Sequence, residues 1–183
     1  YDFGTWWGKQ SSGLVCLFKE TITNIHSITF RPFASCWMQD CLANKGYIII
    51  NVGDFELIFS HLQDPNAGLI ISAENTNRCQ LKSILNDASE SSIIIGDFNI
   101  EADTMEKWLS DTNLSVLSPL IPTCQNNIFD YAICTPSLSN DALIQVLYDY
   151  NNPSDHEIIL VQLGDQEQLY ERFNNPFVKP KKF

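Results

Sequence analysis

Short runs of β-branched and aromatic residues alternate with polar turns along most of this chain, which predicts a protein built largely from strands. Gly53-Asp54 separates two of these runs by two residues, a spacing typical of a β-hairpin. Arg31-Pro32 ends another run, because proline cannot donate a hydrogen bond to a neighbouring strand. The expected strands cover residues 14–18, 22–30, 47–52, 55–59, 93–95, 128–134, 143–148 and 158–161.

Two segments instead follow the helical period. Residues 74–88 place Leu81, Ile84 and Leu85 on one stripe, and a short helix is expected over residues 105–109, capped by Asp103 or Thr104. Strands interrupted by a few helices predict an α+β fold, an α/β sandwich of two packed β-sheets flanked by helices. We expect one domain over residues 1–164, followed by a polar C-terminal tail over residues 165–183.

The most informative run is the apolar segment from Ile93 to Ile95, which is directly followed by Gly96 and Asp97. Three β-branched residues in succession predict a strand that is buried on both faces. Side chains two residues apart on an extended segment point the same way, so Asp97 and Asn99 should present oxygen atoms to one spot. An ordinary Gly-Asp turn after a strand would give the same pattern, so other residues must decide between the two interpretations.

Three further polar motifs accompany this stretch. They are Phe59-Ser60-His61-Leu62 at the end of an expected strand, Asp130 within the strand 128–134, and Ser154-Asp155-His156 before the last strand. In this order and with these gaps, the four motifs resemble the endonuclease/exonuclease/phosphatase superfamily, whose members share the deoxyribonuclease I fold. The resemblance implies that the motif loops gather at one edge of the sandwich.

The resemblance implies metal-binding and water-binding roles for three of these residues. Asp97 and Asp155 would lie beside a magnesium ion, and Asp97 together with Asn99 would hold the attacking water and the phosphate. These residue types suit the roles, because magnesium prefers oxygen ligands and typically takes only one or two carboxylates, with water completing its octahedron.

The resemblance also implies the acid and base groups of a phosphodiesterase. His156 would be the general base, since imidazole titrates near neutrality, and Asp130 would be the carboxylate that orients it. His61 would donate a hydrogen bond or a proton to the phosphoryl oxygens as charge develops on them. Taken singly, each histidine or aspartate fits a structural role equally well, and only the ordered set favours catalysis.

A second stretch, from Asp40 to Gly46, indicates which branch of the superfamily the chain resembles. Asp40 lies five residues before Lys45-Gly46, which opens a strand leading to His61-Leu62, and this arrangement resembles the neutral sphingomyelinase branch of the superfamily. The branch implies that Lys45 acts as a switch that alternately pairs with Asp40 or leaves it free at the site. The other interpretation is a surface ion pair, which contributes little to stability.

The charge of the chain bears on its partners. The sequence has 22 acidic residues against 11 lysines and arginines, a formal net charge of −11. A protein that grips a nucleic-acid backbone usually shows a basic face, so nucleic acid is a disfavoured partner. The resemblance to the sphingomyelinase branch implies sphingomyelin as the substrate, cleaved to ceramide and phosphocholine. The acidic charge agrees with this, because a zwitterionic choline phospholipid at a membrane surface tolerates nearby carboxylates.

Part of the family pattern is missing from this sequence. Members of the superfamily carry an earlier central strand with an asparagine, followed by a Gln-Glu pair whose glutamate is the main magnesium ligand, and neither motif occurs here. The resemblance therefore covers about the last two thirds of the family domain. We expect that a separate N-terminal segment or a partner chain completes the domain. The alternatives are another superfamily hydrolase, such as a nuclease or phosphoinositide phosphatase, and a catalytically inactive lipid-binding or assembly module.

The six cysteines show no zinc-like spacing. Cys16, Cys79 and Cys134 lie in apolar or amphipathic surroundings, where a free thiol in the core is the expectation. Cys36 and Cys41 are close enough in sequence to form a disulfide if the protein is secreted. No apolar run approaches the length of a membrane span, and the compartment stays open between secreted and membrane-associated.

Overall fold

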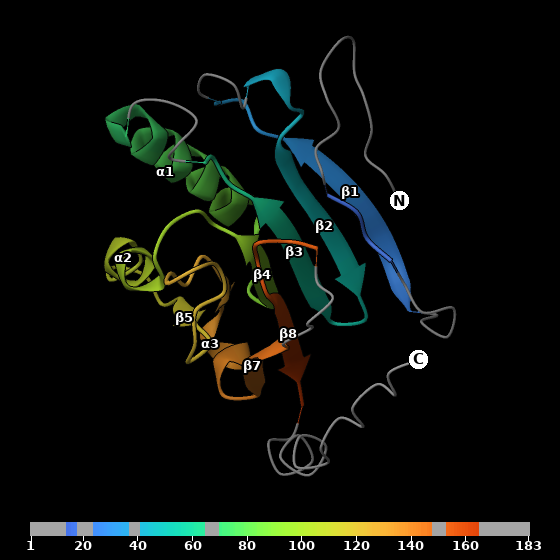
Figure 1. Cartoon of the computed structure of the whole chain (residues 1–183). Coiled ribbons are helices and arrows are strands. Elements are labelled where there is room, and N and C mark those ends of the chain that lie inside the picture. Colours follow the sequence, from blue (N-terminus) through green and yellow to red (C-terminus); the bar gives the residue numbers. More distant parts are fainter. Residues whose placement is uncertain (1–13, 18–23, 37–40, 65–69, 148–152, 165–183) are drawn as a thin grey trace, which may run out of the picture.

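The computed structural model describes residues 14–17, 24–36, 41–64, 70–147 and 153–164 (Figure 1). Most of the expected strands and both expected helices are present, with ends that differ by a few residues. In chain order the elements are β1 (Ile25–Pro32), β2 (Gly46–Val52), β3 (Phe55–His61), α1 (Ile70–Asp87), β4 (Ser92–Asp97), α2 (Ala102–Trp108), β5 (Ser115–Leu117), β6 (Asp130–Cys134), α3 (Pro136–Ser139), β7 (Ala142–Leu147) and β8 (Ile158–Leu163).

Six strands form the main sheet, in the order β1-β2-β3-β4-β6-β5. Strands β2 and β3 form the expected hairpin, with Val52 paired to Phe55 across Gly53-Asp54 and a positive φ of 57° at Gly53. Strands β3 and β4 run parallel because α1 carries the chain back between them, and every other pair in the sheet is antiparallel. β7 and β8 form a separate two-stranded antiparallel sheet.

One face of the main sheet packs against the helices. Ile58, Ile94 and Ile133 come from three adjacent strands and contact Ile84 of α1 and Met105 of α2 in the larger core cluster. All five side chains are almost fully buried. Burial of an aliphatic side chain of this size contributes roughly 1.5–3 kcal/mol, so this layer supplies much of the stability of the fold.

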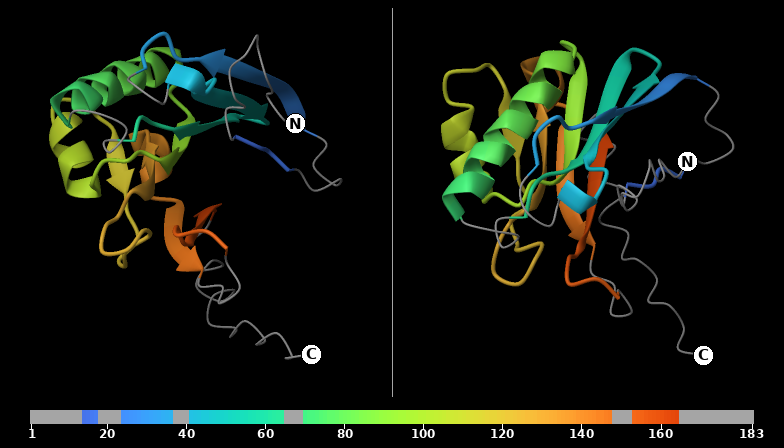
Figure 2. Two further views of the ribbon diagram at one scale, coloured as in Figure 1. Left: turned by 45° about the horizontal axis from the view of Figure 1, so that its top comes forward. Right: turned by 90° about the horizontal axis from the view of Figure 1, so that it is seen from above.

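The opposite face packs against the small sheet. Ile93, Ala132 and Cys134 form a second core cluster with Ile144 of β7 and Val161 of β8. Figure 2 shows α1 and α2 on one side of the main sheet and β8 on the other, and Leu138 of α3 joins the cluster on the side of β8. Two sheets with helices outside them confirm the expected α+β sandwich, and they explain why residues 93–95 read as a strand buried on both faces.

Several local expectations are corrected by the structure. Residues 14–17 form only an isolated bridge at Val15 rather than a strand, and Phe18 lies outside the described residues. Helix α2 has Glu101 as its N-cap, without a side-chain capping bond, so neither Asp103 nor Thr104 caps it. β5 and α3 were not expected, because elements of three and four residues span fewer than two periods of their hydrophobic patterns and so show no repeat.

The cysteines follow their expected states with one exception. Cys36 and Cys41 form a disulfide, and Cys134 is buried in the core as a free thiol. Cys16 is a partly buried free thiol, whereas Cys79 is exposed on the outer face of α1, so the expectation of a core thiol is wrong there. The expected tail over residues 165–183 lies outside the described residues.

Helix α1 is the longest helix of the structure, with 18 residues. Its sequence mixes apolar residues with asparagine, glutamine and charged residues along its whole length. Within the described part of the chain, no helix combines the length and the apolar character that crossing a bilayer requires.

Gly96 sets the spacing between β3 and β4. A Cβ atom at this position would lie 1.9 Å from the backbone oxygen of Ser60, a distance that no side chain could occupy. Ser60 and Gly96 are paired directly across the two parallel strands. The glycine therefore permits the close approach of the two strand ends that carry His61 and Asp97.

We predict that Gly96→Ala lowers the free energy of unfolding by at least about 2 kcal/mol, because the new methyl group must push two paired strands apart. Urea denaturation followed by circular dichroism measures the change. Glu90→Ala, at an exposed position before β4, is the matched control and should stay within about 0.5 kcal/mol of the parent chain. Equal stability of the Gly96→Ala and Glu90→Ala proteins would contradict this account.

Candidate active site

Three neighbouring strands bring three of the predicted site residues into one row. His61 is the last residue of β3 and pairs with Asp97, the last residue of β4, which in turn pairs with Asp130, the first residue of β6. Residues paired directly across adjacent strands project to the same face of a sheet. The row therefore places an imidazole and two carboxylates together at one edge of the main sheet, as the motif order implied.

Asn99 lies next to Asp97 as expected, but in a backbone conformation that differs from the expected extended one. Asn99 has a positive φ of 52°, so the chain turns after β4 instead of staying extended. Within this turn the Asn99 backbone N–H donates to Oδ1 of Asp97 over 2.9 Å, and its side-chain amide donates to Leu62 O over 3.3 Å. The two side chains do meet, but a left-handed turn brings them together rather than the period of a strand.

His156 reaches the row from the segment before β8. Its backbone forms a bridge with Cys124, and the N–H of Glu157 donates to the carbonyl of Thr123 over 2.7 Å. Nδ1 of His156 lies 2.7 Å from Oδ2 of Asp130, and the ring N–H donates because an ionised carboxylate can only accept. This hydrogen bond orients the ring and leaves Nε2 as the nitrogen that can accept a proton.

The buried hydroxyl of Thr123 fixes the carboxylate end of this pair. Thr123 is fully buried, and its Oγ1 accepts the backbone N–H groups of Phe129 and Asp130 over 3.1 and 3.0 Å. The start of β6 and the loop that contacts His156 are therefore held by one side chain. The role of Thr123 could not be predicted from a sequence motif, because it depends on the loop before β6 folding back onto the start of that strand.

Asp97 lies between the two histidines. Its Oδ2 is 3.5 Å from Nε2 of His61 and 3.9 Å from Nε2 of His156. Burial and the negative charge of Asp130 raise the pKa of Asp97 to about 6, although the Asn99 N–H and the charges of His156 and Lys45 act in the other direction. Two neighbouring carboxylates repel each other when both are ionised, so the site favours a cation.

The pKa of His156 is also displaced. Burial disfavours the charged ring, but this is outweighed by the hydrogen bond and the charge of Asp130, with further contributions from Asp97 and Asp155, and the net effect raises the pKa of His156 above its ordinary value. A raised pKa makes the ring a stronger proton acceptor, which suits a general base.

Lys45 lies close to this row, directly before β2. Its Nζ donates to the carbonyl of Leu62 over 2.9 Å, directly after β3, and its charge contributes to the electrostatics of Asp97. Asp40, the expected partner of Lys45 in the switch, lies outside the described residues. The structure thus brings Lys45 to the site, and the switch itself stays a prediction.

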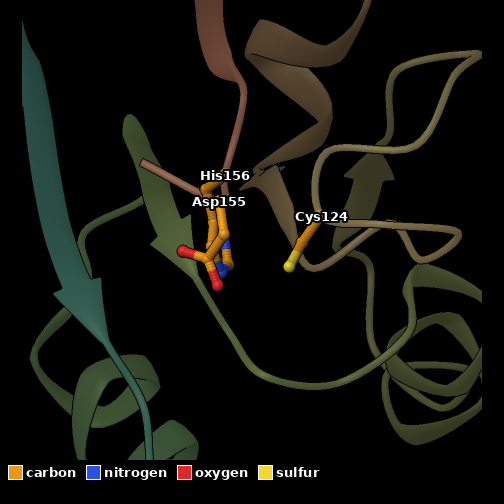
Figure 3. Close-up of side chains that lie close together, drawn as sticks. All are labelled: Cys124, Asp155 and His156. Carbon is orange, nitrogen blue, oxygen red and sulfur yellow. The ribbon is translucent and has the colours of Figure 1, made fainter. Parts of the chain in front are cut away.

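Asp155 belongs to a different group of side chains from Asp97. Ligand atoms of Asp97, Asp130 and His156 lie within 4.8 Å of one another, and so do those of Cys124, Asp155 and His156 (Figure 3). The two groups share His156. Asp155 itself is exposed, whereas Cys124 is almost fully buried.

Polar residues of α1 hold the segment after His61. Gln80 accepts the backbone N–H of Gln63 with Oε1 over 2.9 Å and donates to Ser35 O, while Asn77 donates to Gln63 O over 3.0 Å. Gln63, Asn77 and Gln80 are at most 2% exposed. Sequence reasoning missed this contact, because amide residues on a helix normally indicate its solvent face, and their partners Gln63 and Ser35 lie far away in the sequence.

The residues present fit a magnesium ion by the chemistry of their donors. Asp97, Asp130 and Asp155 supply carboxylate oxygens and Asn99 supplies an amide oxygen, which are the ligand types that magnesium prefers. The raised pKa of Asp97 is consistent with this, because burial and, to a smaller extent, the charge of Asp130 both disfavour an isolated carboxylate there, and a cation would offset them.

No protein-family model matches the sequence, and no curated protein is similar enough to be matched. Solved structures are similar in fold. Sphingomyelinase C from Streptomyces griseocarneus matches with a TM-score of 0.57 at 15% identity over 76% of this chain and 65% of its own. A beta toxin variant from Staphylococcus aureus with bound magnesium ions matches with a TM-score of 0.61 at 15% identity over the same shares.

An endonuclease domain of a telomere-specific non-LTR retrotransposon matches with a TM-score of 0.52 at 17% identity, over 77% of this chain and 71% of that domain. These proteins share one architecture. The chain has a deoxyribonuclease I-like fold. It spans about two thirds of the length of the two bacterial proteins, and at these identities the likeness concerns the fold alone.

We predict that Asp130→Asn lowers the pKa of His156, because the asparagine removes both the negative charge and the charge-assisted hydrogen bond that raise it. Titration of the His156 ring followed by NMR in metal-free buffer measures the change. Asp111→Asn, an exposed carboxylate in the turn after α2, is the control and should leave the His156 titration unchanged. An unaltered pKa in the Asp130→Asn protein would show that the pair does not exist in solution.

Proposed function

We propose that this chain is the catalytic part of a metal-dependent phosphodiesterase that hydrolyses sphingomyelin, or a related choline phospholipid, to ceramide and phosphocholine. The observation that carries the proposal is the hydrogen-bonded pair of His156 and Asp130 beside Asp97. A base oriented by one carboxylate and adjacent to a second is the arrangement needed to deprotonate a water molecule that attacks a phosphodiester.

His156 would act through Nε2. Because Nδ1 donates to Asp130, Nε2 carries the lone pair on the side of Asp97 and takes the proton of the attacking water. Asp130 stabilises the charged ring that forms, without taking the proton itself. Asp97 and Asn99 would position the water and the phosphate in front of this nitrogen.

His61 would act on the opposite side of Asp97. Its Nε2 lies within 3.5 Å of the Asp97 carboxylate, and 43% of its side chain is exposed, so a phosphate entering from solvent can reach it. A protonated His61 donates to a phosphoryl oxygen as negative charge builds up there. Lys45 lies close enough to add a positive charge to the same region.

Magnesium, when bound through Asp97 and Asp155 with help from Asn99, would supply positive charge to the phosphate and lower the barrier to attack. Asp130 is committed to His156 by a short hydrogen bond, so it is the carboxylate least available to the ion. The ligand set in this chain is sparse, since the glutamate expected from the family pattern has no counterpart in the sequence.

Choline phospholipid is favoured over nucleic acid by charge. The chain carries 22 acidic residues against 11 basic ones, and three carboxylates surround the proposed base. A polyanionic backbone would be repelled from such a site, whereas a quaternary ammonium group would not. The sphingomyelinase fold neighbours agree with this choice, and the endonuclease neighbour makes a nuclease the rival that the experiment must test.

A further polypeptide segment is proposed to complete the domain as a β-strand. A groove of about 600 Å³ runs over the sheet face beside the small sheet, with Leu57, Phe59 and Ile95 on its floor and Asp97 and Asp130 at one end. Ile159 of β8 also lines it, and β8 pairs only with β7 among the named strands. Residues 14–17 line the groove as well. Among the described strands the second edge of β8 has no partner, and an apolar floor beside such an edge fits an added strand.

The experiment measures phosphocholine release from sphingomyelin in mixed micelles by the purified chain, with magnesium and with a chelator. We predict magnesium-dependent release that falls on the order of 10²–10⁴-fold in the His156→Ala protein, because the general base is lost. His26→Ala is the matched control, since His26 is exposed on β1 near the opposite end of the sheet. Its rate should equal that of the parent chain.

Other outcomes discriminate between the rivals. Cleavage of plasmid DNA or a phosphoinositide in preference to sphingomyelin would assign the site to another hydrolase class. Binding of sphingomyelin vesicles without turnover would indicate a non-catalytic lipid-binding module, unless expression together with a completing segment restores hydrolysis. A His156→Ala protein that keeps its fold and the parent rate would refute the assigned base.

A further inference from the structure

A second group of potential metal ligands contains the proposed base and one proposed magnesium ligand, Asp155, and adds a thiol, Cys124, that has no role in the reaction described above. Ligand atoms of Cys124, Asp155 and His156 all lie within 4.8 Å of one another. Figure 3 shows the Cys124 sulfur pointing toward the other two side chains from a separate segment of the chain. The set combines a thiol, an imidazole and a carboxylate, three different donor types.

The backbone holds this cluster in place. Cys124 and His156 are partners in an antiparallel bridge, so their side chains project to the same side. The next pair in this ladder is tied by the hydrogen bond from Glu157 N to Thr123 O. Cys124 is further fixed by two backbone hydrogen bonds with Asn127, which close a tight turn. The donors are therefore positioned by paired backbone segments rather than by mobile surface side chains.

The thiol and the imidazole of this group differ in chemistry from the oxygen donors expected to hold magnesium, whereas the carboxylate of Asp155 is common to both sets. Magnesium prefers oxygen ligands, whereas thiolate and imidazole together select zinc and similar thiophilic ions. We propose that Cys124, Asp155 and His156 bind a zinc ion, and that zinc at this position inhibits the enzyme by occupying His156. Three protein ligands with water in the fourth position match a common zinc coordination.

Inhibition follows from the shared histidine. A cation on Nε2 takes the lone pair that must accept the proton, and a cation on Nδ1 displaces the hydrogen bond to Asp130. Either arrangement removes the general base. If Nε2 is the ligand, Asp130 becomes the carboxylate behind the bound imidazole, a partner that metal-binding histidines usually have.

Cys124 must lose its proton for the sulfur–zinc bond to form, and that proton passes to solvent. Zinc affinity should therefore increase with pH, and magnesium should not compete for the sulfur.

Binding is tested with cobalt as a spectroscopic substitute for zinc, using the whole chain with its free thiols reduced. The parent chain should show the thiolate-to-cobalt charge-transfer absorption, and zinc should abolish it by displacement. Cys124→Ala should lack the band and bind zinc at least about 10-fold more weakly. Cys79→Ala removes an exposed free thiol and should behave like the parent chain.

The inhibitory part rests on the proposed function, and the binding part does not. Zinc added in excess magnesium should suppress phosphocholine release by the parent chain and by Cys79→Ala, with weaker suppression of Cys124→Ala relative to its own uninhibited rate. If the chain has no hydrolytic activity, the cobalt band still decides whether the site exists. A band of unchanged intensity in both Cys124→Ala and a folded Cys124→Ser protein would overturn the proposal.

Discussion

The site depends on the pairing of β4 with strands on both sides. β3 ends at His61, β4 ends at Asp97 and β6 begins at Asp130, and the hydrogen-bonded register aligns these three ends in one row. A shift of one residue in either pairing would turn a functional side chain to the opposite face. Gly96 permits the close contact of β3 and β4, so backbone packing one residue before the carboxylate controls the geometry of the site.

Electrostatic crowding is the chemical consequence of that register. Asp97 and Asp130 are placed on neighbouring strands with only 18% and 13% of their side chains exposed. The repulsion is relieved differently for each residue, because Asp130 pairs with His156 while Asp97 accepts the Asn99 N–H and keeps a raised pKa. One carboxylate is thereby fixed as the partner of the base, and the other remains suited to a cation.

His156 is the point at which three features of the molecule meet. It pairs with Asp130 of the main sheet, it bridges to Cys124 of the loop before β6, and it precedes β8 of the small sheet. The position of the ring therefore depends on how both sheets pack. The same position makes it accessible to two sets of donors, oxygen-rich on one side and containing sulfur on the other.

The sequence by itself determined the two-sheet architecture, the hairpin at Gly53-Asp54 and the set of polar residues at strand ends, because hydrophobic periodicity and turn residues are local properties. Only the tertiary structure decided the partners. The pairing of His156 with Asp130, the proximity of Cys124 and the fully buried polar contacts of Gln80 depend on segments far apart in the chain. A one-dimensional pattern shows which side chains are polar, but only strand register and loop closure determine which of them meet.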